Sequence, residues 1–414
     1  MSKLIVELYG TVLGTLSPKG NLFDFKAGHN VFAKYQLTST IMSLSVPLNL
    51  RYTAPQKKRA SNFFAELLPE GRNFEWLAQS LPREERTLYG LLRKYGKDIA
   101  GALYIYDPED PASSVKAEAE PVDGKTIRYL LEHMPQAALA NSPVSGKTSL
   151  GGVQGKIVLA KTGAAWHRVH NGYPSTHILK PIVPEYPTMI YDEVFCMQMA
   201  YDSGLTAHPV WIEDFDGADA LVIERYDRDD GERIHQEDFN QALGAKGSEK
   251  YQEYGGKVSA KRIAQTLARF GSAGDVIKFA SQLIFAIAIG NLDMHAKNVS
   301  ILHFPDESIM LAPAYDQVPL RHQSTDGRMA LAINGKYLHA GISMPDITAE
   351  LTSWRCPGIS APDDAFLFVN NCLKNYCAAL DKATPDSRAH PGLKAMISSF
   401  ISRLMSGMEI GTHT

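Results

Sequence analysis

The chain has 414 residues, of which 44% are apolar and 21% are charged, and its formal net charge is −3 at pH 7. This length allows a large buried core and predicts two or three domains. The small negative charge argues against tight, unaided binding to nucleic acid, which usually needs a strongly basic surface. The four cysteines form no C-x-x-C pair, and the start of the sequence lacks the apolar segment of a secretory signal. We therefore expect a soluble, cytoplasmic protein without a membrane span.

The first hundred residues predict a small domain that mixes strands and helices. Residues 3–16 alternate in polarity and contain glycines where a strand, a turn and a second strand would meet. Residues 60–95 predict three helices, each ending before a proline or glycine, and residues 97–106 return to a strand-like pattern. Residues 107–124 carry three prolines, many charges and few apolar side chains, which is typical of a linker. The sequence therefore predicts an N-terminal α/β subdomain at residues 1–108.

The pattern changes after about residue 145, where strands and a helix follow one another in the order of a kinase small lobe. A glycine-containing strand and turn, a second strand, a helix and two further strands are predicted at residues 150–159, 175–180, 190–203, 209–213 and 220–226. The chain is then mostly helical, with helices predicted at residues 236–243, 257–270, 275–289, 365–382 and 394–408. We therefore predict an α+β, two-lobed protein-kinase-like fold, with the small lobe at residues 125–226 and a helical large lobe at residues 227–414.

The most informative motif lies directly after the most apolar predicted helix. Asp293 and Asn298 stand five residues apart in N-L-D-M-H-A-K-N, and Asp316 follows 18 residues after Asn298. The first interval equals that of the protein-kinase catalytic loop, H-R-D-x-x-x-x-N, although no His-Arg pair precedes Asp293. In such sites one carboxylate accepts the proton of the attacking hydroxyl, while an amide and a second carboxylate hold Mg²⁺ on the phosphates of ATP. The spacing therefore predicts Asp293 as the catalytic base, and Asn298 and Asp316 as the magnesium ligands.

Alternative roles remain open at each of these positions. Asp293 can also serve as a helix-end cap, and Asn298 and Asp316 can stabilise turns through their own backbone. Two further polar residues, His295 and Lys297, lie inside the motif. We expect Lys297 to neutralise the transferring phosphate, while His295 either contacts the nucleotide or serves as a structural hydrogen-bonding group.

Two segments upstream predict the contacts to the phosphates of ATP. The first is the glycine-rich stretch Gly151, Gly152, Val153, Gln154, Gly155 and Lys156. Glycine lets backbone N–H groups approach phosphate oxygens, although a plain β-turn with a surface lysine is the alternative. The second is Lys180, which ends an apolar strand before a proline and can be oriented by Glu193 on the next helix. A lysine that merely leaves a strand end for solvent is the alternative there.

Several ordered segments resemble the HipA family, the serine/threonine-kinase toxins of bacterial HipBA toxin–antitoxin modules. Similar motifs follow one another as L-L-P-E-G at 67–71, D-I-A-G-A-L at 98–103, Ser149 with the glycine-rich stretch, S-T-H-I-L-K at 175–180, V-I-E-R-Y-D-R at 222–228, N-L-D-M-H-A-K-N at 291–298 and P-A-Y-D at 313–316. The similarity covers nearly the whole chain. It implies a kinase fold related to protein and phosphoinositide kinases, with a family-specific subdomain at the N-terminus.

The resemblance also implies roles for individual residues. By motif it assigns the base to Asp293, magnesium to Asn298 and Asp316, the ATP phosphates to Lys180 and the loop at 151–156, and adenine to the backbone at Glu224 and Tyr226. It further implies that Ser149 can be autophosphorylated, which stops activity because a doubly charged group beside a phosphate cradle repels the nucleotide. Gly152 and Gly155 stand where relatives have bulkier or charged residues, so the behaviour of this loop can differ from theirs.

The same resemblance implies partners and a biological role. A HipB-like helix-turn-helix antitoxin is expected to bind the chain and to connect it indirectly with operator DNA. The expected substrate is a translation protein of the aminoacyl-tRNA synthetase class, and its phosphorylation would cause growth arrest and persistence. Two other functions remain open: a kinase for a small molecule or lipid, and a catalytically silent subunit that only assists repression.

Overall fold

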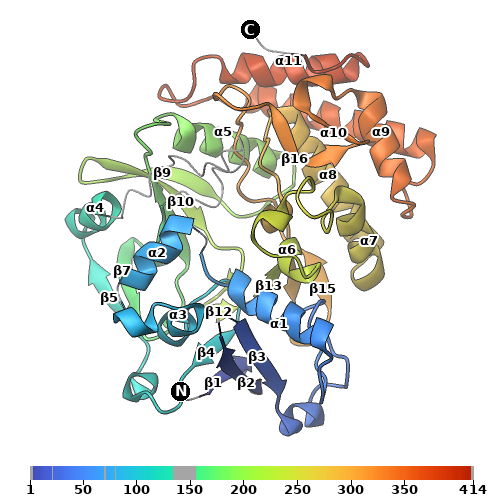
Figure 1. Cartoon of the computed structure of the whole chain (residues 1–414). Helices are drawn as coiled ribbons and strands as arrows, with labels where there is room; N and C mark the ends of the chain where they lie inside the picture. The colour runs from blue at the N-terminus through green and yellow to red at the C-terminus, as the bar shows by residue number, and fades with distance from the viewer. Residues whose placement is uncertain (1–2, 21, 70, 80, 134–154, 412–414) are drawn as a thin grey trace.

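The computed structural model describes residues 3–20, 22–69, 71–79, 81–133 and 155–411. A four-stranded sheet, a six-stranded sheet and a mostly helical part follow one another along the chain. In Figure 1 the first sheet and the N-terminus lie at one end of the molecule, and the last helices lie with the C-terminus at the opposite end. Among the described residues, no helix is both long enough and apolar enough to cross a membrane.

Four antiparallel strands and three helices form the N-terminal part. The strands are β1 (Leu4–Leu8), β2 (Thr11–Lys19), β3 (Leu22–Ala27) and β4 (Tyr104–Tyr106), in the order β3-β2-β1-β4, and the helices are α1 (Ala54–Glu66), α2 (Gly71–Gln79) and α3 (Leu88–Tyr95). A capping box between Thr53 and Gln56 starts α1. This helix packs on β3 through Phe64, whose ring centroid lies 5.4 Å from that of Phe25. Residues 3–16 form a strand, a turn and a second strand, as their alternation predicts.

A six-stranded antiparallel sheet forms the middle part. Its strands are β5 (Glu118–Val122), β6 (Ile157–Thr162), β7 (Ala165–His170), β8 (His177–Pro181), β9 (Val210–Phe215) and β10 (Ala218–Glu224), in the order β5-β7-β6-β8-β10-β9. Leu221 packs with residues of α5 (Met189–Asp202), whereas its neighbour Val222 packs with residues of α4 (Gly124–Glu132). Because adjacent strand residues point to opposite faces, the two helices cover opposite faces of the sheet.

The linker expected at residues 107–124 is partly wrong. Residues Glu118–Val122 form the edge strand β5, which pairs with β7 along its whole length. Its side chains are mostly exposed, so the segment lacks the apolar pattern by which a strand is recognised in sequence. Pro121 is tolerated because an edge strand has one side without ladder hydrogen bonds.

The remaining chain is helical with three small sheets. The strands are β11 (Arg228–Asp229), β12 (Glu232–Arg233), β13 (His235–Asp238), β14 (Ser300–His303), β15 (Ile309–Leu311), β16 (Arg328–Ile333) and β17 (Lys336–Leu338); the helices are α6 (Phe239–Ala242), α7 (Ala260–Phe270), α8 (Ala273–Ile289), α9 (Met344–Ser353), α10 (Pro362–Lys382) and α11 (Leu393–Met405). Helix α8 is the centre of this part, since residues 283–289 are at most 1% exposed. The prediction of a helix at 236–243 is wrong at its start. Residues His235–Asp238 instead form a strand that pairs with β14, and Asp238 caps a short α6. The three domain limits at 1–108, 125–226 and 227–414 stay a prediction.

Two buried histidines are expected to make the fold sensitive to acid. The Nε2 atoms of His235 and His339 lie 2.8 Å from the backbone oxygens of Met42 and Ile287. Burial is the main cause that lowers the pKa of His235 to about 3 and that of His339 to about 4. An unfolded histidine takes up its proton near pH 6.5. The unfolded state therefore binds more protons below that pH, and the free energy of unfolding falls as the pH is lowered.

We expect the free energy of unfolding to fall by about 1.4 kcal/mol per pH unit for each of these histidines between about pH 6 and pH 4. Chemical denaturation at a series of pH values measures the slope. In His235→Gln the amide can still donate to Met42, but the titrating ring is gone, so the slope should be shallower. A variant with the slope of the wild type would contradict the assignment.

Candidate functional site

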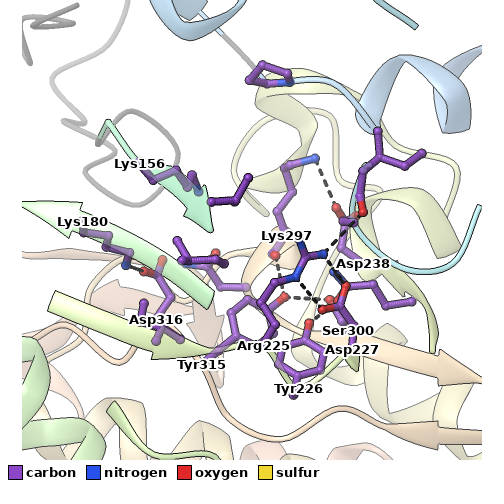
Figure 2. A pocket seen from close by; sticks show the side chains of 18 of the residues that line it. Lys156, Lys180, Arg225, Tyr226, Asp227, Asp238, Lys297, Ser300, Tyr315 and Asp316 are labelled. Carbon is purple, nitrogen blue, oxygen red and sulfur yellow. Dashed lines mark hydrogen bonds and ion pairs between the residues drawn. The ribbon is translucent and has the colours of Figure 1, made fainter. Parts of the chain in front are cut away.

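A cavity of about 480 Å³ lies where the six-stranded sheet meets β13, β14 and two loops of the N-terminal part. Its volume is within the usual range for small-molecule sites. Of the residues predicted from sequence, it is lined by Lys156, Lys180, Glu193, Glu224, Tyr226, His295, Lys297, Asn298 and Asp316. Figure 2 shows Lys156, Lys180 and Asp316 on one side of this space and Lys297 with Asp238 on the other. The fold thus gathers side chains from distant segments around one cavity.

Lys180 is held by two carboxylates at the sheet side of the cavity. It stands in β8 opposite Leu221 of β10, and its Nζ donates to Glu193 Oε1 and to Asp316 Oδ1, both at 2.8 Å. Burial alone would lower the pKa of Lys180, but the two carboxylates outweigh it and raise that pKa. The lysine is therefore a fixed cation, and the expected partnership with Glu193 on α5 is present in the geometry.

Asp316 has an unusual backbone conformation. Its φ angle is +55°, in the left-handed region that few residues other than glycine adopt. The backbone oxygen of Asp316 accepts a hydrogen bond from Asn291 Nδ2 at 3.2 Å, which fixes the strained turn. Such strain is typical of functional sites, and here it directs the carboxylate toward Lys180.

Hydrogen bonds from two asparagine side chains fix the conformation of the predicted catalytic loop. Helix α8 ends at Gly290, which adopts the left-handed conformation with φ +75°. The side-chain oxygen of Asn291 accepts from the backbone N–H of Asp293 at 3.0 Å, and Asn298 Nδ2 donates to the backbone oxygen of Asp293, also at 3.0 Å. The loop between the helix and β14 is therefore rigidly folded around Asp293.

Asp293 lies beside the cavity rather than in its wall. It is 7% exposed and is not among the lining residues, but His295 and Asn298 connect it with that wall. Its Oδ1 accepts a hydrogen bond from Tyr251 Oη at 3.1 Å, and its Oδ2 lies 4.0 Å from His295 Nε2. One carboxylate oxygen is therefore oriented by a phenol, and the other faces the imidazole at the cavity.

His295 is a neutral, buried side chain at the cavity. Burial first, and then the nearby cations of Lys250 and Lys297, lower its pKa well below the ordinary value. Neither ring nitrogen of His295 has a hydrogen-bond partner among the described residues. Since buried polar groups rarely stay without partners, this supports contact with a ligand over the structural role considered above.

Lys297 is engaged by carboxylates from two parts of the fold. Its Nζ lies 2.8 Å from Glu66 Oε2 and 3.1 Å from Asp238 Oδ2. Glu66 ends helix α1 of the N-terminal part, and Asp238 ends β13. The cation expected to meet the transferring phosphate is thus already paired.

Part of the expected phosphate-binding loop lies outside the described residues. This applies to Ser149, Gly151, Gly152, Val153 and Gln154. Gly155 and Lys156 are described, and Lys156 lines the cavity directly before β6.

The expected adenine segment borders the cavity through Glu224 and Tyr226. The backbone N–H of Glu224 donates to Pro209 at 3.3 Å, so the N–H of this residue is already used within the protein. The ring of Tyr226 lies on that of Tyr315, with centroids 5.4 Å apart. The segment is therefore fixed by its contacts with Pro209 and Tyr315.

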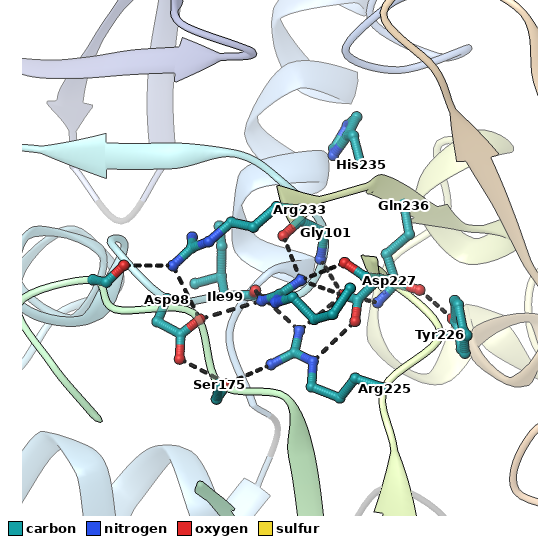
Figure 3. A network of polar contacts seen from close by, with 12 residues as sticks. Asp98, Ile99, Gly101, Ser175, Arg225, Tyr226, Asp227, Arg233, His235 and Gln236 are labelled. Atoms are coloured by element: carbon teal, nitrogen blue, oxygen red, sulfur yellow. Dashed lines mark hydrogen bonds and ion pairs between the residues drawn. The ribbon is translucent and has the colours of Figure 1, made fainter. Parts of the chain in front are cut away.

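A buried network of charges fixes the same segment to the N-terminal part (Figure 3). Asp227 accepts two hydrogen bonds from Arg225, at 2.9 and 2.8 Å, and one from the backbone N–H of Gly101 at 2.7 Å. Arg228 adds an ion pair with Asp227 at 3.1 Å. Burial favours the neutral form of Asp227, but the two arginines and the Gly101 N–H outweigh it and lower its pKa to about 2.

Asp98 extends this network. Its Oδ2 accepts from Ser175 at 2.9 Å, and its Oδ1 lies 3.2 Å from Arg228 and 3.3 Å from Arg233. Ser175 also accepts from Arg225 at 2.8 Å. Carboxylates and guanidinium groups thus alternate across the contact between the N-terminal part and the strand that borders the cavity.

The sequence did not predict that the N-terminal part contributes to the cavity. Glu66, Leu67, Leu68, Pro69, Asp98, Ile99 and Ala100 all line it. The segments at 67–71 and 98–103 were recognised only as family motifs. The polar residues within these two short motifs were the available sign of a functional role. No local sequence pattern, however, indicates which distant surface they contact.

Comparisons with known proteins agree with this geometry. The family model of the HipA-like C-terminal domain matches residues 148–359, about half of the chain, and that of the HipA N-terminal domain matches residues 4–106. Y4mE of Sinorhizobium fredii, a protein named as a kinase, is 34% identical over 286 residues, which cover 66% of this chain and 68% of that protein. The serine/threonine-protein kinase toxin HipA of Shewanella oneidensis is 27% identical over 324 residues, which cover 73% of this chain and 72% of that protein.

A solved structure agrees over nearly the whole length. The match is to a complex of HipA, HipB and operator DNA from Shewanella oneidensis MR-1, with a TM-score of 0.77 and 21% identity over 97% of this chain and 96% of that chain. This likeness confirms the two-lobed, kinase-like α+β fold. The chain belongs to the HipA family of serine/threonine-kinase toxins, and it is a kinase.

Proposed function

We propose that the chain is an ATP- and Mg²⁺-dependent protein serine/threonine kinase and the toxin of a type II toxin–antitoxin module. The observation that carries this proposal is the contact of Lys180 with both Glu193 and Asp316 inside a cavity of nucleotide size. Phosphoryl transfer depends on positioning and charge neutralisation more than on covalent chemistry. A buried lysine fixed by two carboxylates provides a positioned cation for the phosphates.

Asn298 and Asp316 both line the cavity and carry oxygen atoms of the kind that Mg²⁺ prefers. Asn298 uses its amide nitrogen for the bond to Asp293, and Asp316 uses Oδ1 for the bond to Lys180. The side-chain oxygen of Asn298 and Oδ2 of Asp316 are therefore the atoms that would hold the ion. Mg²⁺ is usually bound by one or two carboxylates together with substrate phosphates, so a small set of hard oxygen ligands is suitable. When bound, Mg²⁺ supplies neutralisation of the phosphate charge.

The protein's own residues have distinct tasks in the proposed reaction. Lys180 binds and orients the phosphates, and the backbone at Glu224 and Tyr226 holds adenine. Asp293, whose Oδ1 accepts a hydrogen bond from Tyr251, accepts the proton of a serine or threonine hydroxyl. The hydroxyl oxygen then forms a bond to the terminal phosphorus, while the bond from that phosphorus to the bridging oxygen of ADP breaks.

Tyr251→Phe should weaken catalysis most at low pH. The phenol donates to the carboxylate of Asp293 and so favours its ionised form. We expect the acidic limb of the pH–rate profile to move upward by about one pH unit, since a hydrogen bond to a charged group contributes about 1.5 kcal/mol or more. Tyr254→Phe, which changes a neighbouring ring that packs edge-on against Tyr251, is the control. Superimposable profiles for Tyr251→Phe and the wild type would contradict this role.

Incubation of the purified chain with labelled ATP, Mg²⁺ and a cell lysate tests the kinase proposal. A labelled protein band, with phosphate on serine or threonine, is the expected result, and an aminoacyl-tRNA synthetase is the substrate class proposed. Label found only in the small-molecule or lipid fraction would overturn the protein-kinase proposal. Failure of the chain to transfer phosphate to any acceptor would favour a silent repressor subunit.

Regulation and partners are proposed from the family. We propose autophosphorylation at Ser149, which mass spectrometry of the purified chain checks against Ser149→Ala. We also propose binding to a HipB-like helix-turn-helix antitoxin, through which the chain reaches operator DNA and co-represses its operon. Copurification with such a protein, and a band shift of operator DNA by the complex beyond that of the antitoxin alone, are the expected results. Growth arrest on expression without the antitoxin is the expected phenotype.

A further inference from the structure

Glu66 is a buried carboxylate that reaches from the N-terminal part to the catalytic loop. Its side chain is 7% exposed. Its Oε2 accepts from Lys297 Nζ at 2.8 Å and from Asn240 Nδ2 at 3.0 Å, and its Oε1 accepts from the backbone N–H of Gly247 at 2.8 Å. The backbone oxygen of Glu66 lies 3.3 Å from the same Lys297 Nζ. Both carboxylate oxygens are therefore bound, and the lysine meets Glu66 at two atoms.

The location of Glu66 is unfavourable for a carboxylate unless its contact with Lys297 compensates for the cost. It is the last residue of α1, where the helix dipole disfavours negative charge. Burial of an ionised carboxylate adds a further cost unless a cation and hydrogen bonds compensate for it. Lys297 is the compensating cation. Local preferences thus oppose an acid at this position, whereas the contact with the catalytic loop favours it.

The surroundings make the contact rigid. Helix α1 docks on α6 and the turn after it, where Asn62 Nδ2 donates to the Gly244 oxygen at 3.3 Å and Gln241 Nε2 donates to the Phe63 oxygen at 3.2 Å. On the other side, the backbone oxygen of Lys297 accepts from Tyr315 Oη at 2.7 Å. A site held by side chains on packed elements keeps its geometry more precisely than one on free loops.

The side chain of Lys297 is flexible and needs a rigid partner to fix the position of its ammonium group. A lysine side chain is a compact charge on a flexible four-carbon stem, and Lys297 directly precedes Asn298, one of the two proposed magnesium ligands. A second partner of Lys297 is Asp238, whose carboxylate also caps α6 by accepting from the backbone N–H of Gln241 at 2.9 Å. The carboxylate of Asp238 is therefore shared between the lysine and the helix. The oxygens of Glu66 on its fixed helix therefore define the position of the ammonium group at the cavity.

We infer that Glu66 is a positioning residue of the phosphotransfer site, supplied by the N-terminal part, which acts by holding the Lys297 ammonium where it meets the transferring phosphate. This inference rests on the proposed kinase function. It makes the N-terminal part a component of the catalytic site rather than an appended module.

The test combines Glu66→Gln, Lys297→Met and the double variant, with steady-state kinetics for ATP in the full-length chain. Glu66→Gln should lower kcat by about 10- to 100-fold, as expected for a misplaced catalytic group, and should leave the KM for ATP within about threefold. Glu66→Asp keeps the charge on a shorter stem and should retain more activity than Glu66→Gln. Glu75→Gln, which changes an exposed carboxylate on α2, is the matched control and should behave as the wild type.

The double variant separates positioning from general stability. If Glu66 acts through Lys297, adding Glu66→Gln to Lys297→Met should change kcat by less than about twofold, since interacting residues are non-additive. An equal loss in both backgrounds would overturn the inference. Melting temperatures identify any variant that fails to fold; should Glu66→Gln be one, Glu66→Asp in both backgrounds gives the same comparison. A wild type that transfers no phosphate refutes the kinase function itself, whereas a fully active Glu66→Gln refutes only this inference.

Discussion

Asp293→Asn should lower phosphate transfer by about 10²- to 10⁴-fold, the usual contribution of a general base. The amide keeps the shape of the side chain and can still accept from Tyr251, but it cannot take a proton from the attacking hydroxyl. Binding of ATP should be nearly unchanged, because Asp293 is not among the residues that line the cavity. Quenched assays with labelled ATP measure transfer, and calorimetry measures binding.

The control for this variant is Asp306→Asn, which makes the same chemical change at an exposed turn. Its rate should equal that of the wild type. A melting temperature of Asp293→Asn close to that of the wild type would show that any loss is catalytic. Undiminished transfer in a folded Asp293→Asn would refute the role of Asp293 as base.

Asp227→Ala should destabilise the fold by about 3–5 kcal/mol, the usual effect of removing one partner of a buried ion pair. The Asp227 side chain is 4% exposed, and those of Arg225 and Arg228 are 8% and 3% exposed. Without the carboxylate, the buried guanidinium of Arg225 loses its ion-pair partner, that of Arg228 keeps only Asp98 among the described residues, and the N–H of Gly101 loses its acceptor. Chemical denaturation of the two proteins gives the difference in unfolding free energy.

The sign of the pH dependence provides a second check on Asp227. Its pKa is lowered to about 2 in the folded protein, against about 3.9 for an unperturbed aspartate. Its stabilising contribution is therefore fully present above about pH 4 and is lost as the pH falls toward 2. Asp229→Ala, at the exposed residue two positions along, is the control. A loss below about 1 kcal/mol in Asp227→Ala would mean that the network is only a surface contact.

The two-lobed fold was accessible from sequence because its elements have strong local signals. Helix α8 ends in an uninterrupted apolar run at residues 283–289 and is capped by Ser272 and Gly290, and the strands around Lys180 are short apolar runs between breakers. The edge strand β5 was missed because its pairing with β7 depends on a distant partner and not on an apolar pattern. The start of the 236–243 segment was misassigned for the same reason, since β14 pairs with it from about sixty residues away.

The site was predicted in part for similar physical reasons. Fixed spacing in one loop indicated Asp293 and Asn298, and a strand end before a proline indicated Lys180. Glu66 and Asp98 escaped prediction, because a carboxylate at a helix end or in a loop has the same local pattern whether it faces water or a catalytic lysine. Only the docking of the N-terminal part on the cavity distinguishes the two situations.

Calorimetric titration with ATP, with and without Mg²⁺, tests most directly whether Lys180, Asn298 and Asp316 form a nucleotide–metal site. The wild type should bind ATP, and more tightly when Mg²⁺ is present; Asp316→Asn should lose most of that difference. A wild type that does not bind ATP, or an Asp316→Asn variant with the full effect of Mg²⁺, would contradict the account.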